Sequence, residues 1–127
     1  MHKPILCLDF DGVIHSYTSR WQGADVIPDP PTEGAIAFIL GALHEFDVVI
    51  FSSRSNQPGG LSAMKKWLKE HAGSTWYESP CGPGLEDVRF VTEKPPAMVT
   101  LDDRAITFTG QWPALSDLMN FKPWNKP

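Results

Sequence analysis

The segment Ile5-Leu6-Cys7-Leu8-Asp9-Phe10-Asp11-Gly12-Val13-Ile14 places two acidic residues directly after an apolar run. Side chains of an extended strand alternate between its faces, so Asp9 and Asp11 are predicted to project to the same side at a strand's carboxyl end. Gly12 then permits a sharp turn. Two carboxylates this close repel each other unless a cation or a proton intervenes. The pair therefore indicates a Mg²⁺ site, with a polar strand end opening an Asp-Gly turn as the alternative.

Later segments repeat this pattern of polar residues after apolar runs. Leu101-Asp102-Asp103-Arg104 ends one such run, and Phe51-Ser52-Ser53-Arg54 ends another. In an open parallel sheet, ligands bind in the crevice outside the carboxyl ends of the strands. The sequence therefore predicts one crevice that collects six polar side chains, those of Asp9, Asp11, Ser52, Lys94, Asp102 and Asp103.

Composition and charge are those of an ordinary globular domain. The chain has 127 residues, 42% of them apolar and 20% charged, which predicts one domain with a single core. A net charge of −4 predicts no general binding to nucleic acid. No apolar stretch approaches the roughly 20 residues that span a bilayer, and the N-terminus lacks the pattern of a signal peptide. Cys7 and Cys81 are expected to be free thiols, so we expect a cytoplasmic protein without a membrane partner.

Predicted strands alternate with predicted helices along the chain. Strands are expected over 4–9, 48–51, 88–92, 98–101 and 105–108, and helices over 32–46, 61–71 and 113–121. Thr32 is expected to cap the first helix and Gly73 to end the second. This order predicts an α/β fold, a single-domain Rossmann-like three-layer sandwich with a mostly parallel five-stranded sheet. Residues 14–31 are expected to form a loop insert, and residues 122–127 a tail.

The polar residues permit phosphoryl transfer. Asp9 could attack phosphorus if Mg²⁺ screened the negative charge, forming an aspartyl-phosphate. Asp11 would protonate the leaving oxygen and then activate water, which requires its acid form when substrate is bound. Ser52 would donate a hydrogen bond to the phosphate, and Lys94 would add positive charge. Taken singly, these residues have structural alternatives, namely strand ends for the serines, a solvated surface position for Lys94, and a turn or helix cap for the second acidic pair.

These motifs resemble those of the haloacid dehalogenase-like hydrolase superfamily, whose members are mostly Mg²⁺-dependent phosphatases. The resemblance covers nearly the whole chain, and its four motifs are Asp9-Phe10-Asp11-Gly12-Val13, Ser52, Lys94 and Asp102-Asp103. It implies that Asp9 is the nucleophile and Asp11 the general acid/base. It also implies a metal held by Asp9, the backbone carbonyl of Asp11 and Asp102, with Asp103 assisting. The short spacing from Lys94 to the last acids is similar to a small bacterial and phage subgroup.

Family members often carry a cap domain, and residues 14–31 and 73–87 are too short to fold as one. An open crevice is therefore expected, with room for a large substrate or for cover by a neighbouring subunit. Tyr17 and Trp21 could stack on a base or sugar, or pack their loop onto the core. Arg54 could clamp the substrate, together with Ser52, Ser53 and Lys94, or pair with an acid.

The expected function is the hydrolysis of a phosphomonoester, with a small phosphorylated metabolite, a nucleotide or a polynucleotide end as substrate. One alternative is a receiver-like signalling module, which also uses acids, a hydroxyl and a lysine around Mg²⁺. The alternate spacing of Asp9 and Asp11 disfavours it, because it places an acid/base beside the nucleophile and so favours rapid hydrolysis. A second alternative is a catalytically silent interaction protein with the same fold.

Overall fold

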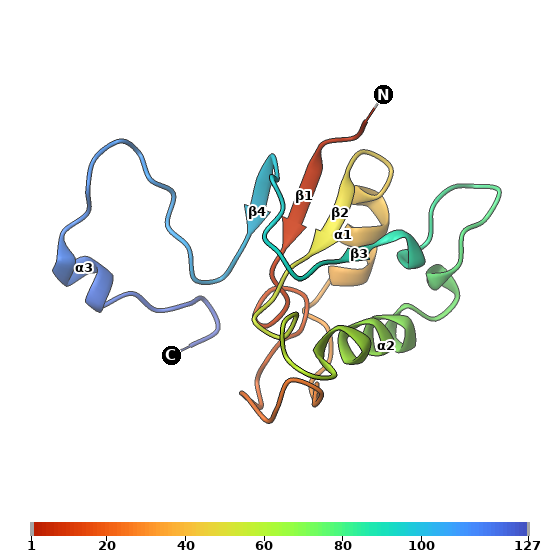
Figure 1. Cartoon of the computed structure of the whole chain (residues 1–127), viewed down its shortest axis with the longest axis horizontal. Helices are drawn as coiled ribbons and strands as arrows, with labels where there is room; N and C mark the ends of the chain where they lie inside the picture. Colours follow the sequence, from red (N-terminus) through yellow and green to blue (C-terminus); the bar gives the residue numbers. More distant parts are fainter. Residues whose placement is uncertain (1, 127) are drawn as a thin grey trace.

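A four-stranded parallel sheet forms the centre of the molecule (Figure 1). The computed structural model describes residues 2–126. The strand order is β3-β2-β1-β4, and all three pairings are parallel, so the predicted α/β class is confirmed. The elements are β1 (Ile5–Leu8), α1 (Ala35–Ala42), β2 (Asp47–Ile50), α2 (Gly60–Ala72), η1 (Gly73–Trp76), η2 (Leu85–Asp87), β3 (Arg89–Phe90), β4 (Val99–Leu101) and α3 (Leu115–Met119).

The two central strands are apolar because both of their faces are covered. Leu8 and Ile50 join the main core with α1 and α2, whereas Cys7 and Val49 alternate to the opposite face and are buried there. In Figure 1, α1 lies behind the sheet, and the segment between β3 and β4 passes in front of it. The parallel register brings the carboxyl ends of β1, β2 and β4 to one edge of the sheet.

Helix α1 is shorter than the predicted helix over 32–46. Thr32 does not cap it, because the Thr32 hydroxyl instead donates a hydrogen bond to the carbonyl oxygen of Val13 (2.7 Å). Gly34, with φ of 82°, precedes the first helical residue. The prediction of Thr32 as the cap was therefore wrong, since its side chain ties the first loop to the helix instead.

Helix α2 agrees with the predicted helix over 61–71 to within one residue at each end. Met64 and Leu68 are fully buried, as their spacing of four residues predicts for one face of a helix. Gly73 follows the last helical residue with φ of 58°, the left-handed region that favours glycine at a helix end.

The C-terminal part departs most from the sequence prediction. The chain turns away from the outer edge of β4 after Asp103, so the expected fifth strand over 105–108 has no partner strand and is not formed. The expected helix over 113–121 is reduced to α3, because Ala114 is extended (ψ 140°). The third strand is likewise reduced, from 88–92 to β3.

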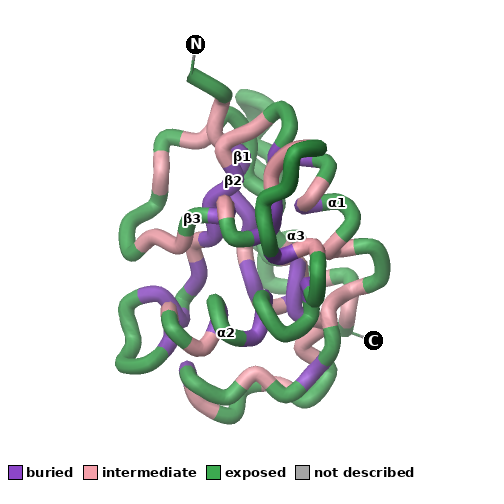
Figure 2. The backbone as a smooth tube through the Cα atoms, turned by 90° about the vertical axis from the view of Figure 1, so that its right-hand side faces the viewer, coloured by how far each residue is buried: buried purple, intermediate pink, exposed green. Residues whose placement is uncertain are grey.

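Burial divides the molecule into a body and a protruding segment. The buried apolar side chains of the described residues lie between Leu6 and Val88. Residues 102–126, α3 included, carry no buried side chain, whereas Figure 2 shows β1 and β2 as largely buried. Within the described range, the structure contains no helix with the length and apolar character needed to cross a membrane.

Candidate functional site

Three carboxylates meet at the carboxyl edge of the sheet. Asp9 follows β1 and Asp102 follows β4, and these two strands are hydrogen-bonded neighbours. The backbone N–H of Asp9 donates to the carbonyl oxygen of Leu101 (3.0 Å), which fixes the two strand ends side by side. One carboxylate oxygen from each of Asp9, Asp102 and Asp103 lies within 4.8 Å of the others. The structure therefore brings together acids that are more than ninety residues apart in the chain.

This clustering disfavours full ionisation. The pKa of Asp9 is raised to about 8, mainly by burial; a hydrogen bond with Asp103 and the charge of Asp102 also raise it, and the N–H of Phe10 opposes them. A proton or a cation is thus needed to stabilise the group. Gly12 allows the close approach of the acids, because a Cβ at this position would overlap the Asp103 carboxylate and its φ is +82°. Three carboxylates offer the hard oxygen ligands that suit Mg²⁺.

Asp11 lies beside this cluster but is held by other partners. Its Oδ1 is 2.8 Å from His15 Nδ1, and its Oδ2 accepts a hydrogen bond from Arg54 Nε (2.9 Å). Burial raises the pKa of Asp11, but the hydrogen bonds from His15 and Arg54 and the charge of Arg54 outweigh it and hold the pKa below its usual value. Asp11 is therefore ionised in the free protein, whereas its expected part as an acid requires the protonated form when substrate is bound.

Arg54 is a buried structural cation. Its Nη1 donates to three backbone carbonyl oxygens of the first loop, those of Gly23 (2.8 Å), Ala24 (3.0 Å) and Val26 (3.1 Å). The guanidinium also stacks over Trp21, 4.7 Å from the ring centroid. Of the two interpretations open for Arg54, pairing with an acid is the one that the geometry favours. Arg54 thereby joins the first loop to Asp11.

His15 is a member of this network that the sequence analysis missed. The side chain is fully buried between Asp11 and Asp29. The backbone N–H of Asp29 points at His15 Nε2 (3.1 Å), which assigns this nitrogen as the acceptor and leaves Nδ1–H to donate to Asp11. The spacing of four residues from Asp11 was the available signal, but it places the two side chains together only if residues 12–15 form a tight turn.

The two serines after β2 have different surroundings. Ser52 is buried, and its Oγ accepts a hydrogen bond from the N–H of Arg54 (3.1 Å). Ser53 is exposed and lines the crevice. The crevice has a volume of about 300 Å³, and its walls are formed by Asp9, Asp11, Tyr17, Trp21, Ser53, Asp102, Asp103 and Arg104. Ser52 does not line it, so its hydroxyl serves the turn after β2.

Lys94 is also absent from this lining. It is exposed on the segment that passes over the sheet between β3 and β4, and it forms no ion pair within residues 2–126. Arg104, two residues beyond Asp102, instead brings a positive charge to the crevice wall. The structure thus gathers the predicted acids and Ser53, and it does not place Ser52 or Lys94 among the walls.

Comparison of the chain with known protein families, with curated proteins and with solved structures finds no match.

Proposed function

We propose that this protein is a Mg²⁺-dependent phosphomonoester hydrolase of the haloacid dehalogenase-like type, acting through an aspartyl-phosphate on Asp9. The observation that carries the proposal is the convergence of Asp9, Asp102 and Asp103 within 4.8 Å at adjacent parallel strand ends, with Asp11 alongside. We also propose a more specific fold. The four parallel strands would form the centre of a Rossmann-like three-layer sandwich, and residues 2–126 do not themselves supply its fifth strand.

The donor chemistry of the cluster fits the proposed metal. Carboxylate oxygens are the preferred ligands of Mg²⁺, and the raised pKa of Asp9 reflects a need for positive charge at this point. Asp9, Asp102 and Asp103 would hold the ion, with the backbone carbonyl of Asp11 as a further ligand. When bound, the ion would screen the negative charge that otherwise repels a carboxylate from a phosphate.

The side chains of this protein supply the nucleophile and the proton transfers. Asp9 attacks phosphorus, the ester P–O bond breaks, and Asp11 gives its proton to the leaving oxygen. Water then attacks the aspartyl-phosphate while Asp11 takes a proton from it, and the P–O bond to Asp9 breaks. This releases phosphate, restores the Asp9 carboxylate and leaves Asp11 protonated, as it was in the substrate complex. Because Asp11 is ionised in the free protein, it must gain its proton as the negatively charged substrate binds and raises its pKa. Arg54 and His15 hold the Asp11 carboxylate in place during both steps.

Phosphate recognition is assigned to the walls of the crevice. Ser53 offers a hydroxyl donor and Arg104 a guanidinium, and both line the cavity. Lys94 is proposed as a second source of positive charge, since its long side chain is exposed and would have to turn toward Asp9. Ser52 contributes by shaping the turn that presents Ser53.

The test is phosphatase activity on p-nitrophenyl phosphate with Mg²⁺ and after its removal with EDTA. The proposal predicts turnover that EDTA abolishes and Mg²⁺ restores, and an inactive Asp9→Asn variant. Glu70→Gln, the same acid-to-amide change at an exposed position of α2, should retain full activity. Metal-independent turnover by the pure protein would contradict this mechanism.

A further inference from the structure

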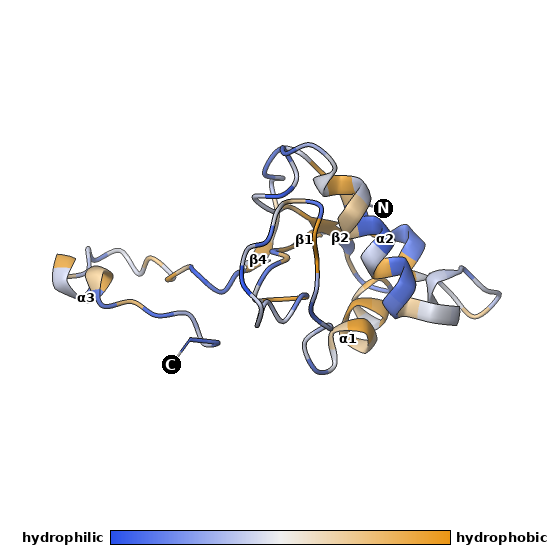
Figure 3. Ribbon diagram, turned by 90° about the horizontal axis from the view of Figure 1, so that it is seen from below, coloured by the Kyte–Doolittle hydropathy of each residue, from blue (hydrophilic) through white to orange (hydrophobic). Residues whose placement is uncertain are grey.

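Residues 104–123 form an arm that protrudes from the body. Figures 1 and 3 show it leaving the sheet after β4, carrying α3 at its far end and returning toward the body. At its return, the indole N–H of Trp124 donates to the carbonyl oxygen of Gly12 (2.7 Å). The arm thus begins at the crevice wall with Arg104, and the residue after its other end is bonded to the turn after β1. No residue between them belongs to the hydrophobic core.

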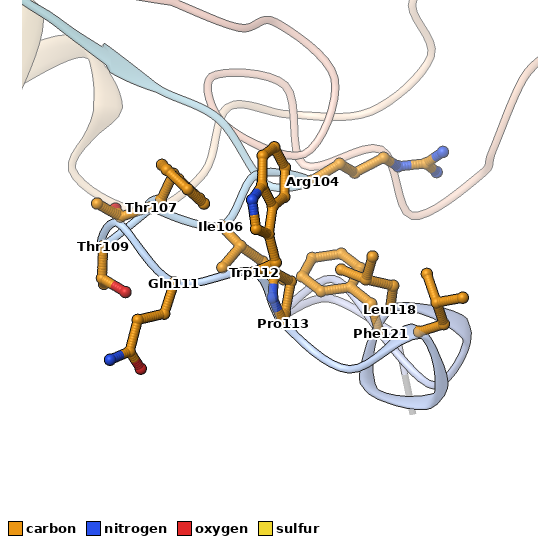
Figure 4. A pocket seen from close by; sticks show the side chains of 11 residues that line it. Arg104, Ile106, Thr107, Thr109, Gln111, Trp112, Pro113, Leu118 and Phe121 are labelled. Carbon is orange, nitrogen blue, oxygen red and sulfur yellow. The ribbon is translucent and has the colours of Figure 1, made fainter.

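The arm is apolar although it is exposed. Trp112 is 87% exposed, Leu115 79% and Met119 86%. Figure 4 shows Trp112, Leu118 and Phe121 around a hollow of about 800 Å³ that is lined by arm residues. The arm has three charged residues in a length of twenty, so little charge opposes its burial. Monomeric proteins rarely expose apolar patches of this kind, which mark interaction surfaces.

The body has an uncovered apolar face of its own. Phe38 on α1 is 52% exposed, and Met98 beside β4 is 70% exposed. Between α1 and β4 lies a groove of about 260 Å³ with a largely apolar wall that includes Leu8, Ile14, Phe38, Ile39 and Leu101. The outer edge of β4 pairs with no other strand in residues 2–126. An unpaired edge of this kind is a template for an added strand.

Residues 105–109 have the pattern of such a strand. Ile106 and Phe108 alternate with Thr107 and Thr109, which suits a strand with one apolar face. The same chain cannot add this segment in parallel, because a parallel crossover needs a dozen or more residues and three residues separate β4 from Ala105. An antiparallel return would have to reverse at 102–104, where the N–H of Arg104 is bonded to Asp102 Oδ1 (2.8 Å) in the carboxylate cluster. A strand from another molecule needs no connection.

We propose that the arm docks on the groove and β4 edge of a second copy of this chain, in a reciprocal two-fold dimer. An isologous exchange buries two arms and two grooves at once. Aromatic side chains bury about 150–250 Å² each, and each arm carries three of them, Phe108, Trp112 and Phe121. With the aliphatic side chains and the opposing grooves, the area reaches the roughly 1,200–2,000 Å² of a stable interface. The exchanged strand would complete a five-stranded sheet.

Sedimentation velocity of the full chain tests this proposal without reference to activity. The expected species at micromolar concentration has twice the 14.1 kDa mass of one chain. The arm variant Trp112→Ser/Leu115→Ser and the groove variant Phe38→Ser should each weaken dimerisation at least about tenfold. Tyr77→Ser, which changes another exposed aromatic outside both surfaces, should not. Because all four positions are exposed, circular dichroism should show every variant folded.

Cross-linking distinguishes exchange from closure of the arm on its own body. In a Cys81→Ser background, a Phe38→Cys chain and a Trp112→Cys chain are mixed and treated with a short bifunctional thiol reagent. Exchange predicts a cross-linked species of two unlike chains. A wild-type monomer at all concentrations, a dimer that both variants leave unchanged, or the absence of a cross-link between the two unlike chains would each overturn the proposal.

Discussion

Arg54 Nε lies 2.9 Å from Asp11 Oδ2, and this buried ion pair joins the turn after β2 to the turn after β1. The same guanidinium donates to three carbonyl oxygens of the first loop. One side chain therefore fixes the positions of that loop, of Asp11 and of the end of β2. A buried charge of this kind is costly unless its partners are complete. The crevice therefore depends for its shape on Arg54 as much as on its acids.

Removing Arg54 should destabilise the protein strongly. Arg54→Ala removes the charged partner of Asp11 and the shared donor of three carbonyl groups, and breaking a buried pair costs about 3–5 kcal/mol. Arg89→Ala is the matched control, because its ion pair with Asp47 (2.7 Å) lies at the surface, where such pairs contribute about 0–1 kcal/mol. Urea denaturation should resolve the difference in unfolding free energy. Equal losses in the two variants would contradict the assigned structural contribution of Arg54.

The stability of the metal-free protein should fall as pH rises. The pKa of Asp9 is about 8 in the folded protein and 3.8 as the ordinary value, so the folded state binds the proton more tightly. Its stabilising contribution is complete below about pH 4 and is lost as pH rises through about 8. The melting temperature in EDTA should therefore decrease between pH 5 and pH 8. Asp9→Asn removes the titrating group, and its melting temperature should show a clearly smaller decrease.

Mg²⁺ should reverse this loss. A ligand that binds only the folded state stabilises it by about 2.7 kcal/mol at a hundred times its dissociation constant. The melting temperature of the wild type at pH 8 should thus rise with added Mg²⁺, and that of Asp102→Asn should rise much less. Glu70→Gln should behave as the wild type. A rise of equal size in Asp102→Asn would show that the ion stabilises the protein from another place.

Tyr17 should favour substrates with a flat leaving group. It lines the crevice beside the acids, where its ring can stack on an aromatic group. Tyr17→Ala should raise KM for p-nitrophenyl phosphate or a nucleoside monophosphate several-fold and leave KM for glycerol phosphate nearly unchanged. Tyr77→Ala provides the control away from the crevice. Parallel changes in KM for both substrate types would mean that Tyr17 shapes the loop rather than the specificity.

The acidic cluster and the sheet were predictable because they follow from local pattern and strand direction. Apolar runs marked β1, β2 and β4, and parallel strands bring their carboxyl ends together, which placed Asp9 near Asp102. The contacts of the first loop were not predictable in this way. His15 reaches Asp11, and the loop carbonyl groups reach Arg54, only through the path of residues 12–31, which has no periodic pattern.

The C-terminal prediction failed for a different reason. Residues 105–108 have the alternation of a strand, but a strand also needs an edge that the chain can reach, and three residues after β4 do not provide a parallel crossover. The prediction that Lys94 lies in the crevice depended on the order of the motifs alone. Its segment has no helix or strand that would direct its side chain into the crevice.

A crystal structure grown with Mg²⁺ and a phosphate analogue such as vanadate tests the central claim most directly. The account predicts one ion coordinated by Asp9 and Asp102 at about 2.1 Å, with the analogue against the free oxygen of Asp9. An ion bound elsewhere, or Asp9 and Asp102 without a shared ion at saturating Mg²⁺, would contradict it.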